Sequence, residues 1–337
     1  MKPRAMTGAY ALAHCLVDFS CAFLAFRVLL PAGDRVTLLL VYNFCAFALQ
    51  MPVGLLADRL DRSGALAALG CCLTALAYLP LPAMGAAVLA GVGNALFHIG
   101  GGLEVLNGAG RRCAALGLFV SPGAVGLWLG GLWGRGGQLG LLLPPLLCAG
   151  AGAALVLLRR RLFSGDGPRC APFSLPSRTR LLPLTALLLV VVLRSYVGMA
   201  VSFPWRSVGL WPVLLVPALA VGKAAGGVLA DRLGVQKTAL FSLAGAAVCF
   251  CLGDRPALGL AAVFLFNMTM PLTLWAAARL LPGAKGFSFG LLTFGLFLGF
   301  LPVCLGSGAL SLTPRAGAAA CVLSLALLLP GLREAAS

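Results

Sequence analysis

Charged residues are scarce in this sequence. Only 10% of its 337 residues are Asp, Glu, Lys or Arg, and nine of these are acidic. About a quarter of the residues of a soluble domain are charged, because they cover its surface, so the composition excludes a water-soluble globular protein. With 61% hydrophobic residues and a mean hydropathy of +1.01, the chain fits a lipid environment.

Several functional motifs are also missing. No G-x-x-x-x-G-K-[ST] segment is present, which argues against a primary pump driven by ATP. The sequence has two histidines and scattered acidic residues, whereas a membrane-embedded transferase needs clustered carboxylates or a His-rich metal site. The twelve cysteines form no C-x-x-C pair and lie mostly in apolar stretches, where Cys acts as a small hydrophobe. We therefore expect no enzyme, no metal site and no cofactor.

Long apolar stretches fill most of the chain, and short polar or Pro/Gly breaks separate them. A membrane-spanning helix needs roughly 20 apolar residues. We predict such helices at residues 6–30, 35–57, 63–82, 84–107, 112–133, 137–158, 181–203, 207–230, 236–253, 257–281, 286–310 and 315–332. The predicted fold is an all-α membrane protein with twelve transmembrane helices in two pseudo-symmetric six-helix bundles, residues 1–160 and 181–337, joined by a cytoplasmic linker at 161–180.

The basic residues indicate the orientation. The formal net charge is +16, and most Lys and Arg residues fall at the N-terminus, in the linker and in alternate loops. Because such residues are retained in the cytoplasm, we predict a multi-pass plasma-membrane protein with both termini cytoplasmic. This placement accounts for the charge without a nucleic-acid partner, and we expect a monomer in the lipid bilayer.

One loop occurs twice. The second predicted span leads into Gly54-Leu-Leu-Ala-Asp58-Arg59-Leu-Asp61-Arg62, and the eighth leads into Gly227-Val-Leu-Ala-Asp231-Arg232. Gly54 and Gly227 are 173 positions apart, as are Asp58 and Asp231. Glycine lets two helices approach closely, and an aspartate can face the positive N-terminus of a neighbouring helix. We predict that Gly54, Asp58, Arg59, Arg62, Gly227, Asp231 and Arg232 form a conformational latch. The alternative is a pair of ordinary cytoplasmic loops.

With this repeated loop, the sequence resembles the major facilitator superfamily along its whole length. Three further segments resemble the fosmidomycin-resistance-like exporters within it: Gln50–Gly54, Asn94-Ala-Leu-Phe-His98 and Leu193-Arg194-Ser195. The resemblance implies a secondary transporter with two six-helix bundles around a central cavity.

Two acidic residues lie inside predicted spans, where an ionisable group costs about 2.5–3.5 kcal/mol at mid-bilayer. Asp18 is one turn from His14, and such a pair can hold or pass a proton. Glu104 is the second, and it can serve instead as a partner of Arg111 or Arg112. We predict proton coupling through Asp18, His14, His98 and Glu104, and the alternative for His14 and Asp18 is a hydrogen-bonded pair that orders the helix.

Other polar residues are candidates for binding substrate. Asn94 and His98 share one face of the fourth span. Arg194 stays charged at any relevant pH, so it needs an anion or carbonyl groups around it. It can bind an anionic substrate, neutralise Asp18 or serve the structure. Asn267 in the tenth span offers an uncharged contact. We predict that Arg194, Asn94, His98 and Asn267 contact the substrate.

The function predicted from these residues is proton-coupled efflux of a drug-like or metabolite substrate by alternating access, with small molecules and protons as partners. A proton-coupled importer of a small organic anion is the alternative. A non-transporting membrane scaffold is the alternative from another class.

Overall fold

The computed structural model describes residues 2–162, 172–174, 178–306 and 311–336. Most of the predicted linker, residues 163–171 and 175–177, lies outside the described residues. The regular structure of the described residues is helical apart from one isolated bridge between Val201 and Leu312, and turns and short irregular segments connect the helices. The helices are α1 (Lys2–Leu24), α2 (Arg35–Asn43), α3 (Gln50–Leu60), α4 (Ser63–Leu76), α5 (Ala83–Ala109), α6 (Ala114–Gly136), α7 (Leu143–Leu162), α8 (Arg178–Ala200), α9 (Trp211–Leu233), α10 (Val235–Cys251), α11 (Pro256–Asn267), α12 (Thr269–Leu280), α13 (Lys285–Leu305) and α14 (Pro314–Ala336).

Ten helical stretches in the described chain are long and apolar enough to cross a membrane. The first two contain π-helical turns, at Ala25–Leu29 and Phe44–Ala48. The predicted tenth span corresponds to α11 and α12, which are interrupted at Met268. Pro271 explains this break, because proline has no N–H to donate to the carbonyl of Asn267.

Two of the predicted spans correspond to helices shorter than the roughly 20 residues typical of a membrane-crossing helix. The prediction of 63–82 is too long, because α4 has 14 residues and ends at Leu76. Pro80 and Pro82 follow closely, and residues that precede proline disfavour the helical conformation. The predicted span 236–253 corresponds to α10, which has 17 residues. Both helices fall below the roughly 20 residues that a span perpendicular to the bilayer needs.

The described chain divides into two compact units. Unit 1 comprises Met1–Gly110, Pro122–Ser174 and Gly283–Phe294, and unit 2 comprises Arg111–Ser121, Leu175–Pro282 and Gly295–Ser337. The first turns of α6 therefore belong to unit 2, and the first turns of α13 belong to unit 1.

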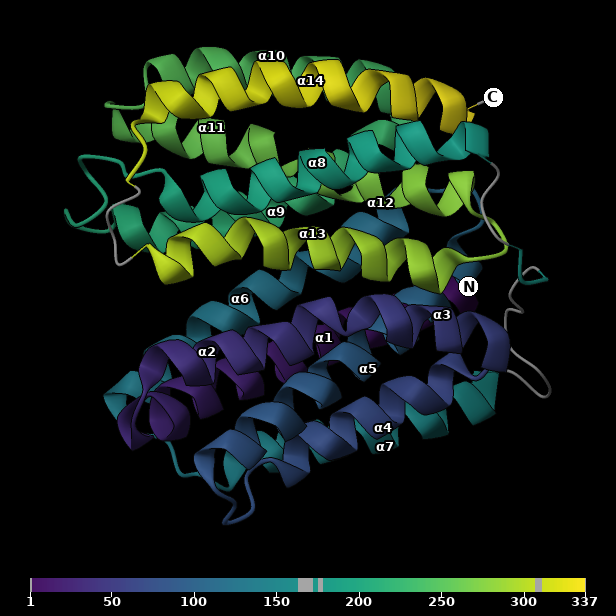
Figure 1. Ribbon diagram of the computed structural model, residues 1–337, viewed down its shortest axis with the longest axis vertical. Helices are drawn as coiled ribbons and strands as arrows, with labels where there is room; N and C mark the ends of the chain where they lie inside the picture. The colour runs from purple at the N-terminus through teal and green to yellow at the C-terminus, as the bar shows by residue number, and fades with distance from the viewer. Residues whose placement is uncertain (1, 163–171, 175–177, 307–310, 337) are drawn as a thin grey trace. The chain divides into compact units, whose positions relative to one another are not determined.

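In unit 1, α5 lies among α1, α2, α3 and α4 (Figure 1). It is the most completely buried of the ten long helices, so polar side chains on it are kept away from lipid. Helix α7 packs against α1 and α4. Helix α6 approaches α1 through Gly126 and Gly130, where a Cβ atom would collide with the carbonyl oxygens of Cys15 and Phe19. Close backbone packing of this kind is common where small residues line a helix interface in membranes.

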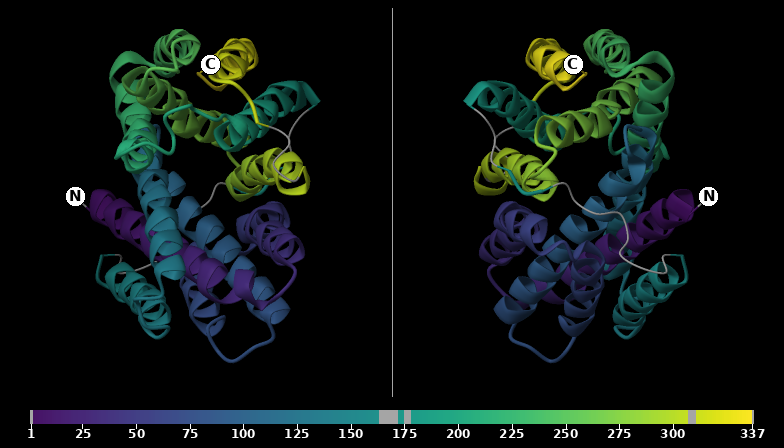
Figure 2. Two further views of the ribbon diagram at one scale, coloured as in Figure 1. Left: turned by 90° about the vertical axis from the view of Figure 1, so that its left-hand side faces the viewer. Right: turned by 90° about the vertical axis from the view of Figure 1, so that its right-hand side faces the viewer.

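In unit 2, α10 and α14 lie side by side, as both views in Figure 2 show. Helix α9 packs against α10, α11 and α12, and α8 packs against α12 and α14. The contact between α8 and α12 brings the buried Arg194 to Thr269 and Thr273.

Candidate functional site

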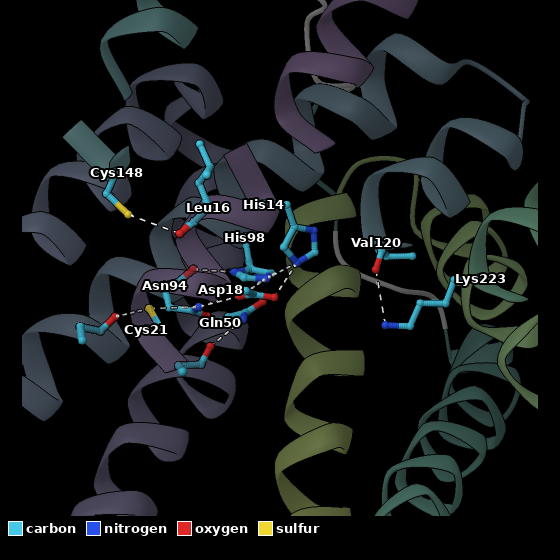
Figure 3. A network of polar contacts seen from close by, with 12 residues as sticks. His14, Leu16, Asp18, Cys21, Gln50, Asn94, His98, Val120, Cys148 and Lys223 are labelled. Carbon is cyan, nitrogen blue, oxygen red and sulfur yellow. Dashed lines mark hydrogen bonds and ion pairs between the residues drawn. The ribbon is translucent and has the colours of Figure 1, made fainter. Parts of the chain in front are cut away.

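Three buried side chains meet between α1 and α5 in unit 1 (Figure 3). Nε2 of His14 lies 3.1 Å from Oδ2 of Asp18 and 2.8 Å from Nε2 of His98. Nε2 of His98 lies 3.6 Å from Oδ1 of Asp18. We call His14, Asp18 and His98 the His–Asp–His triad.

Helical spacing positions each part of this cluster. His14 and Asp18 are four residues apart and share one face of α1, and Asn94 and His98 do the same on α5. The side-chain amide of Asn94 donates to Oδ1 of Asp18 at 3.1 Å, and its backbone carbonyl lies 2.9 Å from Nδ1 of His98. The sequence predicted the two pairs separately, and the structure joins them in one network.

The hydrogen bonds determine where protons sit on the imidazoles. A carbonyl oxygen only accepts, so Nδ1 of His98 carries the proton that it donates to Asn94. In neutral His98, Nε2 then presents a lone pair, and Nε2–H of His14 faces both this lone pair and the carboxylate of Asp18. One further proton makes an imidazolium beside the carboxylate. The triad would carry a net charge of −1 without this proton and would be neutral with it.

All three side chains are withdrawn from the surface, because His14, Asp18 and His98 are only 5%, 6% and 8% exposed. A charge held in a membrane interior costs several kcal/mol unless it is paired or faces water. Since the protonated triad is neutral, taking up a proton relieves this cost.

Gly123 on α6 leaves space beside the triad. A Cβ atom at this position would collide with Nε2 of His14 and Oδ2 of Asp18. Any residue larger than glycine would therefore displace the two groups that share the proton. Gly123 was not among the site residues predicted from the sequence, because its role depends on how α6 packs against α1.

Glu104 is placed apart from the triad. Its Oε1 accepts a hydrogen bond of 2.7 Å from the hydroxyl of Ser63 and lies 3.3 Å from Nε of Arg159. The carboxylate is almost fully buried and the Arg159 side chain is one-third exposed. The sequence suggested Arg111 or Arg112 as the partner of Glu104. In the structure the partner is Arg159, which lies in the last turn of α7. This pairing was not visible in the sequence because it joins helices far apart in the chain.

Arg194 is the most deeply buried cation of unit 2 among the described residues, at 7% exposure. Its guanidinium donates to the hydroxyls of Thr269 and Thr273 at 3.3 and 3.5 Å. The hydroxyl of Thr269 donates in turn to the carbonyl of Phe266 at the end of α11, and that of Thr273 donates to the carbonyl of Met270 in α12. Within the described chain no carboxylate pairs with Arg194, so a neutral environment surrounds a permanent positive charge.

Asn267, the remaining predicted substrate contact, donates its side-chain amide to the carbonyl of Val263 at 2.8 Å. This bond stays within α11, one turn back. The side-chain oxygen of Asn267 can therefore accept a hydrogen bond from another group.

In unit 1 the first copy of the repeated loop holds the start of α13. Oδ1 and Oδ2 of Asp58 accept hydrogen bonds from the backbone N–H groups of Gly286 and Phe287 at 2.7 and 2.8 Å. A carboxylate at a helix N-terminus satisfies unpaired N–H groups and favours the helix dipole. A Cβ atom on Gly54 would overlap the carbonyl oxygen of Gly286, so glycine permits this approach.

In unit 2 the second copy holds the start of α6 in the same way. Oδ1 and Oδ2 of Asp231 accept from the N–H groups of Cys113 and Ala114 at 2.6 and 3.1 Å. A Cβ atom on Gly227 would lie 2.7 Å from the carbonyl oxygen of Cys113. Gly286 and Phe287 follow Cys113 and Ala114 by the same 173 positions that separate the two aspartates.

The arginines of the two loops differ in their surroundings. The guanidinium of Arg59 lies 5.0 Å from the centre of the Phe173 ring, a cation–π contact within unit 1. Arg62 and Arg232 are exposed at the ends of α3 and α9.

Solved structures share this arrangement of helices. FucP, described as a major facilitator superfamily transporter in the outward conformation, is 13% identical; the match covers 98% of this chain and 100% of that chain, with a TM-score of 0.62. The fold is that of the major facilitator superfamily. A bacterial homologue of the iron transporter ferroportin in an outward-facing state is 17% identical, with 98% of each chain covered and a TM-score of 0.62. A variant of the E. coli fucose:proton symporter FucP is 14% identical, with 97% of this chain and 98% of that chain covered and a TM-score of 0.62.

No family model matches the chain, and no curated protein matches it. The solved structures with this fold include a fucose:proton symporter and a bacterial homologue of an iron transporter.

Proposed function

We propose that the chain is a proton-coupled secondary transporter that works by alternating access, with twelve membrane-spanning helices in two six-helix bundles. The observation that carries the proposal is the His–Asp–His triad, in which a buried carboxylate lies within 3.6 Å of two imidazole nitrogens. Proton uptake there changes the net charge of a buried site. Alternating access of such a site to the two sides of a membrane would couple proton movement to transport.

The groups around Asp18 favour this role. His14 faces it from α1, and His98 and Asn94 face it from α5. Its charge also reaches the thiols of Cys15, Cys21 and Cys148 and the phenol of Tyr42. None of these other groups is normally charged at neutral pH. The two imidazoles are therefore the groups with which Asp18 exchanges protons.

The experiment is transport in proteoliposomes under an imposed pH gradient, measured by an internal pH dye while candidate compounds are added. Asp18→Asn should abolish substrate-dependent proton movement and leave downhill substrate exchange. Asp34→Asn is the control, because Asp34 is an exposed N-cap residue of α2 and asparagine caps a helix as well as aspartate does. Proton movement at the wild-type rate in Asp18→Asn would exclude the triad from coupling.

The direction follows the resemblance to fosmidomycin-resistance-like exporters, so we propose efflux of a drug-like or metabolite substrate across the plasma membrane. The chain would act as a monomer with both termini cytoplasmic. Cells that carry the gene should tolerate a transported compound better than cells without it. Dependence on the gene for growth on that compound would indicate import instead.

Arg194 favours a second candidate, proton-coupled import of a small organic anion. A buried guanidinium whose partners are two threonine hydroxyls has donors to offer an anionic group. Arg194→Gln should then remove any preference for a carboxylate compound over its amide, whereas Arg194→Lys should keep part of it. An equal preference in the wild type and Arg194→Gln would reject this candidate.

The two repeated loops would act as the latch. Each places a carboxylate on the first N–H groups of a helix, α13 for Asp58 and α6 for Asp231. We propose that these bonds hold one conformation of the transport cycle, the outward-open state, and break when the substrate site turns to the other side.

A further inference from the structure

The His–Asp–His triad has the composition and spacing of a metal site. It offers two imidazole nitrogens and one carboxylate group. The two Nε2 atoms lie 2.8 Å apart, Oδ2 of Asp18 lies 3.1 Å from Nε2 of His14, and Oδ1 of Asp18 lies 3.6 Å from Nε2 of His98. In a tetrahedral site with metal–ligand bonds of about 2.0–2.1 Å, neighbouring ligand atoms lie about 3.3 Å apart. The three distances lie on either side of this value, and one ligand atom from each of the three side chains lies within 4.8 Å of the other two. The three side chains are therefore close enough together to share one ion.

The groups behind the donors fit the same role. A metal-bound histidine usually donates its other ring N–H to a carbonyl or carboxylate, which orients the ring. Nδ1 of His98 does this toward the carbonyl of Asn94 at 2.9 Å. The bond directs the Nε2 lone pair of His98 toward His14 and Asp18, as metal coordination requires.

Two further observations point to a ligand. Asn94 is 2% exposed, and its side-chain oxygen has no hydrogen-bond partner among the described residues. A half turn of this amide would bring the oxygen to where its nitrogen now lies, 3.1 Å from Oδ1 of Asp18. On the other side, Gly123 leaves out the Cβ atom that would fill the space against His14 and Asp18.

We propose that His14, Asp18 and His98 bind one divalent transition-metal ion, with Asn94 or a water molecule as the fourth ligand. Two imidazoles and a carboxylate suit ions such as Zn²⁺, whereas Mg²⁺ and Ca²⁺ prefer oxygen ligands alone. The site rests on the proposed transport function in one respect, because alternating access gives an ion a route to a buried site. Its geometry is independent of proton coupling.

The test is Zn²⁺ binding to the full-length purified protein in detergent at pH 7.5, after chelator treatment, by calorimetry. We expect one Zn²⁺ per chain, with a dissociation constant at least about tenfold higher in His14→Gln and in His98→Gln than in the wild type. Asp34→Asn is the matched control and should bind as the wild type does. Mg²⁺ should give no binding heat.

A second measurement does not depend on the variants folding. X-ray absorption of the Zn²⁺-loaded wild type should show nitrogen and oxygen ligands at about 2.0–2.1 Å. A sulfur shell at about 2.3 Å would place the ion on cysteines and overturn the proposal. Absence of Zn²⁺ binding to the wild type, or unchanged affinity in both histidine variants, would overturn it too.

The outcomes separate this inference from the proposed function. If Asp18→Asn loses proton coupling while the wild type binds no Zn²⁺, the metal site is rejected and the proton-coupled transporter stands. If Zn²⁺ binds through the two histidines while Asp18→Asn couples normally, the metal site stands and the proposed coupling mechanism is rejected.

Discussion

At the scale of single residues, Asp18 and Glu104, the two acidic residues inside the spans predicted from the sequence, have different partners. Asp18 faces two imidazoles, which exchange protons near neutral pH, whereas Glu104 faces Arg159, which stays protonated. The geometry therefore favours Asp18 as the proton carrier and assigns Glu104 a role in joining α5, α4 and α7.

Glu104→Gln tests this division. The amide still accepts from Ser63 but no longer balances Arg159, so we expect the free energy of unfolding to fall by about 1.5–3 kcal/mol, the range for hydrogen bonds to charged groups. One-third exposure of Arg159 favours the lower end of this range. Thermal unfolding measures the loss. The pH dependence of transport should match the wild type, and a lost pH response would return Glu104 to the proton path.

The side chains of the triad and Asn94 were among the site residues predicted from the sequence, whereas two residues that contact predicted site residues were not. His14, Asp18, Asn94 and His98 could be found because helical spacing places each pair on one face. Arg159 was assigned only to the positive cytoplasmic side, and Gly123 was not selected. Their roles depend on contacts between helices distant in the chain, which local periodicity does not encode.

At the scale of elements, α6 determines how tightly the triad is enclosed. Its glycines Gly126 and Gly130 bring it against the backbone of α1, and Gly123 then lies at His14 and Asp18. The sequence predicted α6 as a span but gave no indication of which helix it faces. The boundaries of the spans were predicted best where polar loops end them, and worst at α4, where prolines end the helix early.

Gly123→Ala tests the role of α6. The new methyl group would collide with His14 and Asp18, so we expect proton coupling to fall sharply and stability to fall by about 1–3 kcal/mol, as in overpacked cores. Gly150→Ala on α7 is the matched control, because a Cβ atom there meets nothing within 4 Å. Coupling is measured by the internal pH dye and stability by thermal unfolding. Wild-type coupling in Gly123→Ala would show that the triad is not confined on this side.

At the scale of the whole molecule, the repeat of 173 positions relates both partners of each loop contact. Asp58 binds the start of α13 in unit 1, and Asp231 binds the start of α6 in unit 2. The sequence predicted the repeat of the aspartates but not the helix that each one caps, because only the fold shows which N-terminus lies opposite. If both contacts hold the same state of the transport cycle, weakening either one should shift the equilibrium in the same direction.

Asp58→Asn and Asp231→Asn test this symmetry. Each substitution replaces a charged acceptor of two backbone N–H groups with a neutral one, which should shift the equilibrium between the two states by about 1–2 kcal/mol, or roughly 5- to 30-fold. Electron spin resonance distances between one label in each unit report the populations. Asp61→Asn is the control, because Asp61 has a positive φ of 48°, which asparagine also adopts readily. The two contacts share no residue, so the two shifts should add in the double variant. If the two single variants shift the equilibrium in opposite directions, the two loops hold different states and the common latch is rejected.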